Sequence, residues 1–345
     1  IMFYKIKSKI ISKSIDKRNK ENAFNYLAAE SFKICPEDDP IINNSYYFSA
    51  HEGELSIFLR LGIRSNIIET WFVILDKDDK YSLKQETFSD ISSSPLKVFL
   101  KDDVWNISFN GLLNHNDIED INVSFEASFV SNIKYIDFSS DMPSIRMAKA
   151  IAQEKWNKAF FNNLNNVSGQ THYEQVGRLN GHYIIRDKKK EFDLPCVRDH
   201  SFGKRDWNYM NNHLWLMGVS SQLDQFNYSL VSYPVISVLE VGNYLCQGQM
   251  NYLLSSDIDL SLLSKGQNLE SIKLKVHLDN GQDIEVEAKV IDTTLYHFQN
   301  DDYTLIENIA IYHIGDKTLK GILEVGFNKD HQRLFNHKDI RKIKR

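Results

Sequence analysis

The alternation of apolar and polar residues predicts a chain built mainly of short β-strands. After a polar and charged stretch of about forty residues, segments of strand length alternate or run apolar, and polar breaks separate them. The segments of the first half are Tyr46 to Ala50, Glu54 to Gly62, Ile67 to Leu75, Leu96 to Leu100, Val104 to Leu112 and Ile121 to Val130. Successive strands with turns such as Lys77 to Lys80 between them predict an antiparallel meander.

Two segments have helical rather than strand character. A short helix is expected around Lys20 to Phe32. A stronger one is expected over Ser144 to Leu164, directly after Pro143, because its apolar residues recur at helical spacing. We expect this helix to link two domains and to pack its apolar face against one or both of them.

Strands resume after that helix and fill the second half. They are expected at Tyr173 to Ile185, Leu214 to Ser220, Tyr228 to Glu240, Tyr244 to Leu254, Ile272 to Leu278, Ile284 to Val290, Tyr303 to Ile314 and Thr318 to Phe327. Strands without βαβ alternation favour barrels or sandwiches and argue against a Rossmann or TIM architecture. A chain of 345 residues has room for two domains. The expected division is 1–142 for an N-terminal β-domain, 143–167 for the linking helix and 168–345 for a C-terminal β-domain.

Charge and cysteine content limit which partners and which cellular location we expect for the protein. The formal net charge of −5 gives no reason to expect a nucleic-acid partner. Basic residues gather near both ends, which is typical of solvated terminal segments, with a membrane-surface or phosphate contact as the alternative. Cys35, Cys196 and Cys246 lack the spacing of a disulfide framework or a thiolate zinc site. With no apolar signal or membrane span, the expected location is the cytoplasm.

Polar and aromatic residues that could bind a ligand or take part in catalysis concentrate between Thr171 and Trp215. In an extended backbone neighbouring side chains point to opposite faces, so Arg198 and His200 share one face and Asp199 points to the other. We expect the basic, aromatic and imidazole groups of this stretch to converge on one small-molecule pocket. The expected catalytic residues are Glu174, Asp199, His200 and His213, and the expected ligand-binding residues are His172, Arg198, Arg205, Asp206, Trp207 and Trp215.

These residue types suit proton transfer in a water-poor cavity. Asp199 or Glu174 would act as the acid and His200 or His213 as relay or base. A purely structural reading, in which Arg–Asp pairs tie strands and loops together, is an equal alternative. The histidines have no HxxxH or HxH spacing, and no phosphate-binding or nucleophile-elbow motif is present. We therefore expect no metal and no cofactor.

The same stretch resembles a known group of proteins. The runs HYEQVGRLNGHY, RDHSFGKRDW and HLW are similar to the H-x-E-x-x-G and RDHSWGxRxW pattern of AttH-like and carotenoid-hydratase-like (hydroxyneurosporene synthase-like) proteins. The helix ending in KWNKAFFNNL precedes the motif, as it does in those proteins. The close match covers about fifty residues, and Phe202 stands where that group usually has Trp.

The resemblance implies two tandem lipocalin-like, or calycin-like, antiparallel β-barrels joined by a helix. It also implies an apolar cavity and, in the catalytic relatives, acid–base or pericyclic chemistry on hydrophobic polyenes without a cofactor. We therefore expect binding of a hydrophobic isoprenoid, polyketide or lipid, with hydration, isomerisation or cyclisation as the reaction. The alternatives are a non-catalytic lipid carrier or sensor and an accessory module of a larger enzyme.

Overall fold

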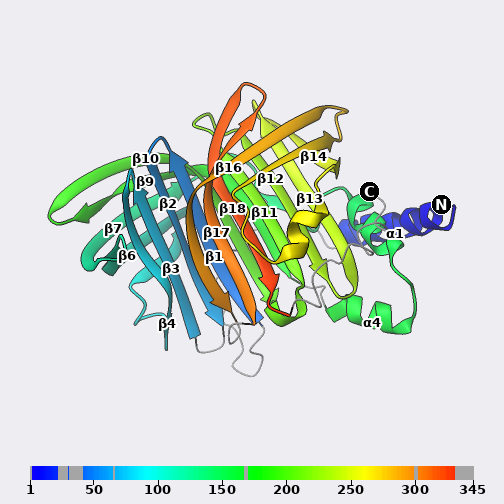
Figure 1. The fold of residues 1–345 in the computed structure, drawn as a ribbon, viewed down its shortest axis with the longest axis horizontal. Coiled ribbons are helices and arrows are strands. Elements are labelled where there is room, and N and C mark those ends of the chain that lie inside the picture. The colour runs from blue at the N-terminus through cyan, green and yellow to red at the C-terminus, as the bar shows by residue number, and fades with distance from the viewer. Residues whose placement is uncertain are drawn as a thin grey trace.

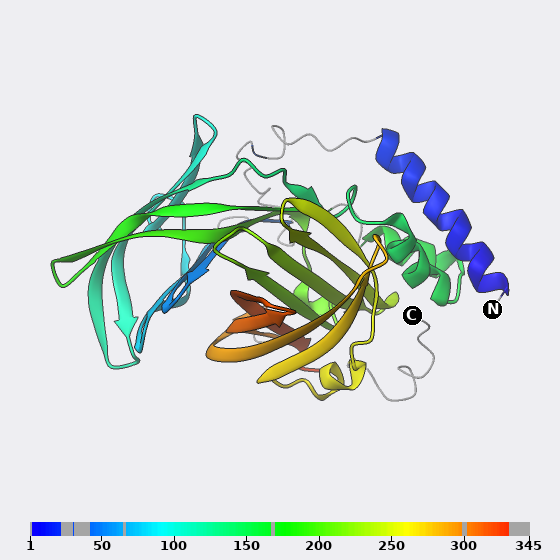
Figure 2. The same ribbon diagram turned by 90° about the horizontal axis from the view of Figure 1, so that it is seen from above.

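The computed structural model describes residues 2–21, 30, 42–64, 67–166, 170–298 and 302–330. Over these residues the chain is mainly β and forms two closed antiparallel barrels that lie side by side (Figures 1 and 2). The predicted fold class is confirmed. None of the helices in these ranges has an apolar stretch long enough to cross a lipid bilayer.

The first barrel closes through the pairing of β9 with β10. Its strands follow the order β10-β1-β2-β3-β4-β6-β7-β9, while β5 pairs with β6 and β8 pairs with β9. The strand bounds are β1 (Ile42–Glu52), β2 (Leu55–Arg64), β3 (Ile67–Asp76), β4 (Asp79–Phe88), β5 (Leu96–Lys101), β6 (Val104–His115), β7 (Glu119–Val130), β8 (Ile136–Asp137), β9 (Thr171–Ile185) and β10 (Lys188–Lys204).

The hairpin of β9 and β10 contains most of the stretch singled out in the sequence, and it is part of the first barrel. β10 pairs with β1, and β9 pairs with β7. The expectation that residue 168 opens the C-terminal barrel does not match this pairing. The sequence could not reveal it, because alternation identifies a strand but not its partner.

The second barrel is a simple meander that closes where β18 returns to β11. Its elements are η1 (Trp207–Tyr209), β11 (Asn212–Val219), β12 (Gln225–Tyr233), β13 (Ile236–Cys246), β14 (Gln249–Ser256), η2 (Leu260–Lys265), β15 (Ser271–Leu278), β16 (Asp283–Phe298), β17 (Tyr303–Ile314) and β18 (Lys317–Asn328). At the closing seam Gly321 faces Gly218, and a Cβ on Gly321 would lie 1.9 Å from the Met217 carbonyl oxygen. Only glycine allows this approach of the two strands.

Two predicted strands of the second half were wrong, because each runs through a turn. The range Tyr244 to Leu254 contains the turn at Gln247 and Gly248 between β13 and β14. The range Tyr228 to Glu240 is a hairpin, with Pro234 and Val235 in the turn between β12 and β13. Apolar residues continue on both sides of the turn, so the pattern hides the break. A proline inside an apparent central strand was the available signal.

The described helices lie beside the second barrel (Figure 2). They are α1 (Met2–Glu21), which was not predicted, α3 (Ser144–Gln153) and α4 (Lys158–Asn166). The single helix expected over Ser144 to Leu164 is thus two helices with a break between them, inserted between β8 and β9. The helix expected around Lys20 to Phe32 falls mostly outside the described residues.

The two barrels pack through the outer faces of their strands. One apolar cluster contains residues of both barrels, and Trp71 of β3 stacks on Tyr296 of β16 at 3.9 Å between ring centroids. β2 is buried along nearly its whole length, on both faces. This double burial explains why the segment after Glu54 is apolar without strict alternation.

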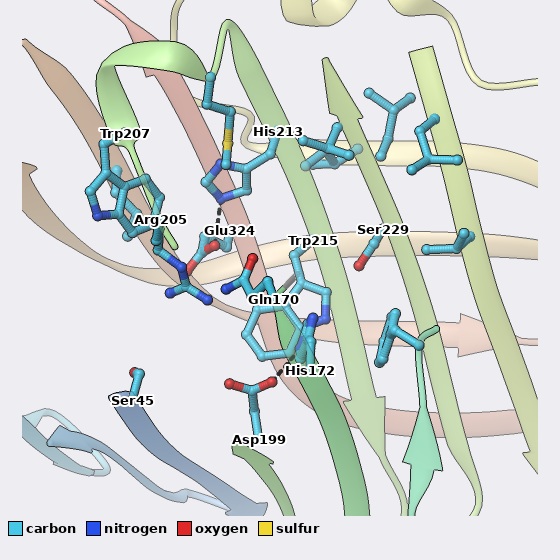
Figure 3. A pocket seen from close by; sticks show the side chains of 18 of the residues that line it. Ser45, Gln170, His172, Asp199, Arg205, Trp207, His213, Trp215, Ser229 and Glu324 are labelled. Carbon is cyan, nitrogen blue, oxygen red and sulfur yellow. Dashed lines mark hydrogen bonds and ion pairs between the residues drawn. The ribbon is translucent and has the colours of Figure 1, made fainter. Parts of the chain in front are cut away.

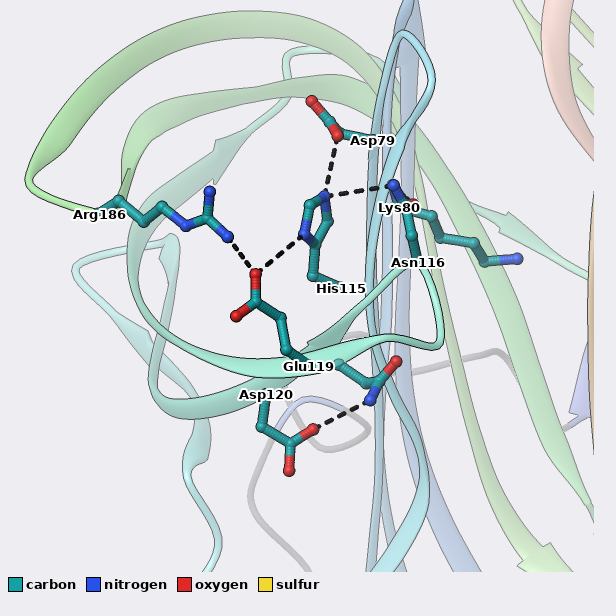
Figure 4. A network of polar contacts seen from close by, with 8 residues as sticks. Asp79, Lys80, His115, Asn116, Glu119, Asp120 and Arg186 are labelled. Carbon is teal, nitrogen blue, oxygen red and sulfur yellow. Dashed lines mark hydrogen bonds and ion pairs between the residues drawn. The ribbon is translucent and has the colours of Figure 1, made fainter.

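Exposed ion pairs lie where β4, β6 and β7 meet their turns in the first barrel (Figure 4). His115 Nε2 contacts Asp79 Oδ1 at 2.8 Å, and its Nδ1 lies 3.9 Å from Glu119, which also pairs with Arg186. Because Asp79, Glu119 and Arg186 are largely in solvent, each pair contributes at most about 1 kcal/mol. They support local turns and are separate from the cavity described below.

A buried arginine joins α3 to the second barrel. Arg146 donates through Nη2 to Glu240 Oε2 at 2.6 Å, through Nε to the Glu240 carbonyl at 3.1 Å and through Nη1 to the Leu254 carbonyl at 2.5 Å. Glu240 Oε1 also accepts hydrogen bonds from Tyr228 and Ser256. Both charges are therefore fully engaged away from solvent.

We expect Arg146→Met to lower the free energy of unfolding by about 3–5 kcal/mol, because it leaves the Glu240 carboxylate buried without its cation. Urea unfolding followed by tryptophan fluorescence measures this. The matched control is Arg178→Met, which removes the surface ion pair with Asp193 and should cost about 1 kcal/mol or less. A similar small loss for both variants would contradict the anchoring role.

Candidate functional site

A cavity of about 290 Å³ lies between the two barrels (Figure 3). One part of its wall is polar and charged and the other is apolar. Its lining residues are Ser45, Tyr47, Arg60, Trp71, Phe138, Met147, Gln170, His172, Asp199, Arg205, Trp207, Met210, His213, Leu214, Trp215, Ser229, Leu230, Val231, Tyr233, Leu239, Val241, Leu305 and Glu324. The volume is near the lower end for small-molecule pockets, about 300 Å³.

Strand alternation in β10 sends its side chains to two different places. Asp199 faces the cavity, whereas Arg198 and His200 point into the first barrel. There Arg198 Nη2 pairs with Glu30 at 2.7 Å, and His200 Nε2 contacts Asn44 Oδ1 at 2.8 Å. Asp199 lies opposite its two neighbours as expected, but Arg198 and His200 do not line the cavity, so the expected convergence of basic and imidazole groups on one pocket does not hold for these two residues.

Asp199 forms an ion pair with Nε2 of His172, which lies on the adjacent strand β9. The ring of Phe138 stacks on His172 at 4.3 Å and fixes its plane. Burial alone would lower the pKa of His172, but the Asp199 carboxylate outweighs it and raises this pKa. No described residue contacts Nδ1 of His172, whose side chain keeps 32% of its exposure. The raised pKa favours the charged form of an imidazole that is held at Nε2 and open at Nδ1.

Glu174 lies behind this pair and does not line the cavity. It is fully buried, and its Oε1 lies 3.8 Å from His172 Nε2. Its Oε2 accepts hydrogen bonds from Asn227 and, at 3.4 Å, from Gln225, both on β12 of the second barrel. Burial raises the pKa of Glu174 to about 8, although His172 acts against the shift. Glu174 therefore supports the site from behind and ties the barrels together.

His213 supplies a second imidazole from the second barrel. Its Nδ1 contacts the Tyr303 hydroxyl at 2.7 Å, and its Nε2 contacts Glu324 Oε1 at 2.5 Å. Burial and then the charge of Arg205 lower the pKa of His213 to about 4. His213 is therefore neutral at pH 7, and both of its nitrogens are engaged in orienting neighbours.

Glu324 and Glu307 are functional candidates that the sequence analysis missed. They face each other directly across β17 and β18. Burial raises the pKa of both carboxyls. The charge of Glu324 raises the pKa of Glu307 further, whereas the hydrogen bond with Glu307 acts against the rise in the pKa of Glu324. Tyr47 of the first barrel donates a hydrogen bond to Glu307. Two buried carboxyls in contact hold one proton between them over a wide pH range.

A signal for this carboxyl pair is present in the sequence. Glu307 interrupts the apolar run TLIENIAIY, and Glu324 interrupts GILEVGF. A carboxylate on a buried strand needs a partner or a proton, so such interruptions mark candidate sites.

Arg205 follows β10 and points into the cavity (Figure 3). It donates to Ser201 Oγ at 2.7 Å and packs over Trp207 at 5.3 Å. The Gln170 amide, oriented with its oxygen toward the guanidinium, accepts from Nη2 at 2.6 Å and from Nε at 3.0 Å. These partners are all neutral.

Of the remaining residues predicted to bind a ligand, two line the cavity and one lies outside it. Trp207 and Trp215 line the cavity, and Trp215 Nε1 donates to Asn227 Oδ1 at 3.2 Å. Asp206 is exposed, precedes η1 and is not part of the lining, so the expectation that it contacts a ligand is wrong for this cavity. The structure thus brings together His172, Asp199, Arg205, Trp207, His213 and Trp215.

One group of cavity-side residues has the donor atoms of a metal site. His172, Glu174 and Asp199 each place one such atom within 4.8 Å of the others. One imidazole with two carboxylates suits a divalent cation. However, His172 and Asp199 already satisfy each other, and the charge of Arg205 acts on both. The local charge therefore favours the imidazolium–carboxylate pair over a bound dication.

We expect Glu174→Gln to stabilise the protein at alkaline pH. A carboxyl whose pKa rises from 4.5 to about 8 on folding stabilises the folded state fully below about pH 4.5, and this contribution is lost as the pH rises to about 8. The neutral amide escapes this loss, worth a few kcal/mol at about 1.4 kcal/mol per pH unit. Urea unfolding at about pH 5 and pH 8 measures the difference.

The exposed Glu191→Gln is the matched control and should show no comparable gain. A Glu174→Gln protein less stable than the parent at about pH 8 would mean that the ionised carboxylate is needed there.

Comparison with solved structures finds the same architecture at very low sequence identity. An AttH protein of Nitrosomonas europaea superposes with a TM-score of 0.55 and 9% identity, over 88% of this chain and 96% of that one. Kievitone hydratase of Nectria haematococca gives 0.52 and 10%, over 90% and 94%. CghA with bound Sch210972 gives 0.50 and 7%, over 84% and 89%. These likenesses show a shared double-barrel, lipocalin-like fold.

Sequence comparison gives a family but no closer relative. No curated protein matches the chain at a significant level. A family described as a domain of unknown function, DUF7064, matches residues 33–329, which include both barrels. The chain belongs to the DUF7064 family.

Proposed function

We propose that this protein binds a small hydrophobic molecule between its barrels and catalyses proton transfer on it without a cofactor. The reaction class is hydration, isomerisation or cyclisation of an isoprenoid, polyketide or lipid. One observation carries the proposal. A single cavity contains two imidazole–carboxyl pairs, one from each barrel, whose imidazoles have pKa values shifted in opposite directions. Such opposed shifts are the usual mark of separate acid and base groups.

The apolar part of the cavity suits the body of such a ligand. Leu230, Val231, Leu239 and Val241 come from β12 and β13, and Met147 comes from α3. A wall of branched aliphatic and thioether side chains with a few polar groups opposite it is typical of sites for small organic molecules. Binding there would be driven by removal of apolar surface from water.

His172 is the proposed proton donor. Its raised pKa favours the protonated imidazole, and Asp199 holds it through Nε2. Nδ1 has no protein partner among the described residues and remains available to a ligand. The carboxylate orients the ring and stabilises the imidazolium, as in other His–Asp pairs. Asp199 acts here by positioning His172.

Glu324 is the proposed proton acceptor. A carboxylate whose pKa is raised is a stronger base than one in water, and burial gives Glu324 this property. His213 fixes its position through a 2.5 Å contact. A donor from the first barrel and an acceptor from the second can then act on one substrate, or on a substrate and a water molecule.

The solved neighbours agree with this class of chemistry by analogy only. One of them is named a hydratase, and another holds the compound Sch210972. At 10% identity or less, a common fold does not transfer an activity. From its RDHSFGKRDW segment we also propose that the chain belongs to the branch of the AttH-like group that carries the RDHSWGxRxW motif. We further propose that it acts in the cytoplasm.

Incubation with apolar metabolite extracts in deuterated buffer tests the proposal. We expect mass spectrometry to detect a product that differs by one water, or an isomer that has gained deuterium. His172→Gln and Glu324→Gln should each reduce turnover by about a hundredfold or more, because each removes one proton-transfer group. His115→Gln, outside the cavity, should retain full activity.

Two results would contradict catalysis. Ligand retention without conversion, seen by native mass spectrometry and organic extraction, would favour the carrier or sensor. An empty protein with no affinity for apolar dyes would favour the accessory module.

The protonation states can be checked without a substrate. We expect His172 to titrate above its ordinary pKa of 6.5 in nitrogen-edited NMR spectra, because of the Asp199 carboxylate. In Asp199→Asn, burial then dominates and the pKa of His172 should fall below 6.5. An unchanged titration in the variant would show that Asp199 does not control this proton.

A further inference from the structure

Buried arginines in this protein are paired with carboxylates. Arg60 Nη1 lies 3.1 Å from Glu69, Arg146 Nη2 lies 2.6 Å from Glu240, and Arg198 Nη2 lies 2.7 Å from Glu30. This is the expected pattern, because a guanidinium removed from water without a counter-charge costs several kcal/mol. Each of these three arginines stabilises the packing within a barrel or between neighbouring elements.

Arg205, which is half-buried, departs from this pattern. It reaches into the cavity, yet its hydrogen-bond acceptors among the described residues are the Ser201 hydroxyl and the Gln170 amide oxygen. Both bind Nη2 or Nε, and Nη1 makes no contact with a protein acceptor there. Nη1 is not enclosed by protein either, so its two N–H groups are accessible from the cavity.

The carboxylates near Arg205 are engaged elsewhere. Asp199 is paired with His172, and Glu324 is paired with His213. Arg60 adds a second guanidinium to the cavity wall, and its nearest carboxylate, Glu69, already pairs with both Arg60 and Arg64. Asp199 and Glu324 therefore act on Arg205 only from a distance, and no described carboxylate forms an ion pair with its guanidinium.

We propose that the ligand of this cavity carries a carboxylate, which Arg205 binds through Nη1, and has an apolar body. This inference rests on the proposed function and names its substrate class, an amphipathic organic acid. The carboxylate forms the ion pair that no described carboxylate forms with Arg205, and a guanidinium is well suited to it because its N–H groups match the spacing of two oxygens.

The cavity gives the rest of such a molecule a defined place. Ser201 and Gln170 hold the guanidinium from one side, and Trp207 packs against its face at 5.3 Å. With the acid group anchored there, the apolar body extends toward Leu230, Leu239 and the neighbouring aliphatic residues. A volume of about 290 Å³ limits the body to a medium-length chain or a fused aromatic system.

Matched acid and alcohol probes test this inference on the intact chain. The probes are decanoate with decanol and naphthoate with naphthylmethanol, and displacement of an apolar fluorescent dye gives the dissociation constants. We expect each acid to bind about tenfold or more tightly than its alcohol, because a charged hydrogen bond to the guanidinium is made only by the acid. Arg205→Met should abolish this preference and leave alcohol binding intact.

Arg178→Met, which removes an exposed guanidinium paired with Asp193, is the matched control and should keep the preference. If Arg205→Met does not fold, Arg205→Gln and the acid-to-alcohol ratio of the parent protein decide the question. Equal binding of acids and alcohols by the parent protein would overturn the inference while leaving the hydrophobic cavity in place. Failure of the parent protein to bind either class would overturn the proposed function as well.

Discussion

The contact between the two barrels is the constraint on which the rest of the structure depends. Each barrel has its own apolar interior, but the outer faces of β1, β2 and β3 also carry side chains that must leave water. The second barrel covers them, with Trp71 stacked on Tyr296 and Tyr47 bonded to Glu307. Where the two curved surfaces do not meet, the cavity remains. The site is therefore a product of the packing of two domains.

The same contact accounts for the electrostatics of the cavity. Asp199, Glu174 and Glu307 lie on strand faces that would be open to solvent in an isolated barrel, and the neighbouring barrel removes that solvent. Burial then shifts their proton affinities unless an opposite charge compensates it. His172 compensates it for Asp199, whereas at Glu307 burial outweighs the opposing effects of Tyr47 and His213. The proton affinities of these groups therefore depend on the contact between the barrels.

Much of the fold and part of the site could be predicted from the sequence. Strand alternation identified two β-rich halves, and the alternation around Asp199 placed it opposite Arg198 and His200, as observed. The sequence did not predict which strands pair and which distant side chains contact each other. The sequence did not show that β9 and β10 close the first barrel, that Arg198 and His200 face its interior, or that Glu324 would meet His213. These contacts join residues about one hundred or more positions apart, and local patterns carry no information on them.

β10 is synthesised long after its partner β1, and this delay affects how the first barrel folds during translation. β1 pairs with β10 across more than a hundred residues, and the helices of the linking segment lie within that interval. A nascent chain that ends before Lys188 has an open sheet with the edges of β1 and β9 unpaired. Closing such a long loop is entropically costly, and unpaired edges invite association with other chains. Until β10 has been synthesised, the first barrel is therefore an open sheet whose unpaired edges need protection from association with other chains.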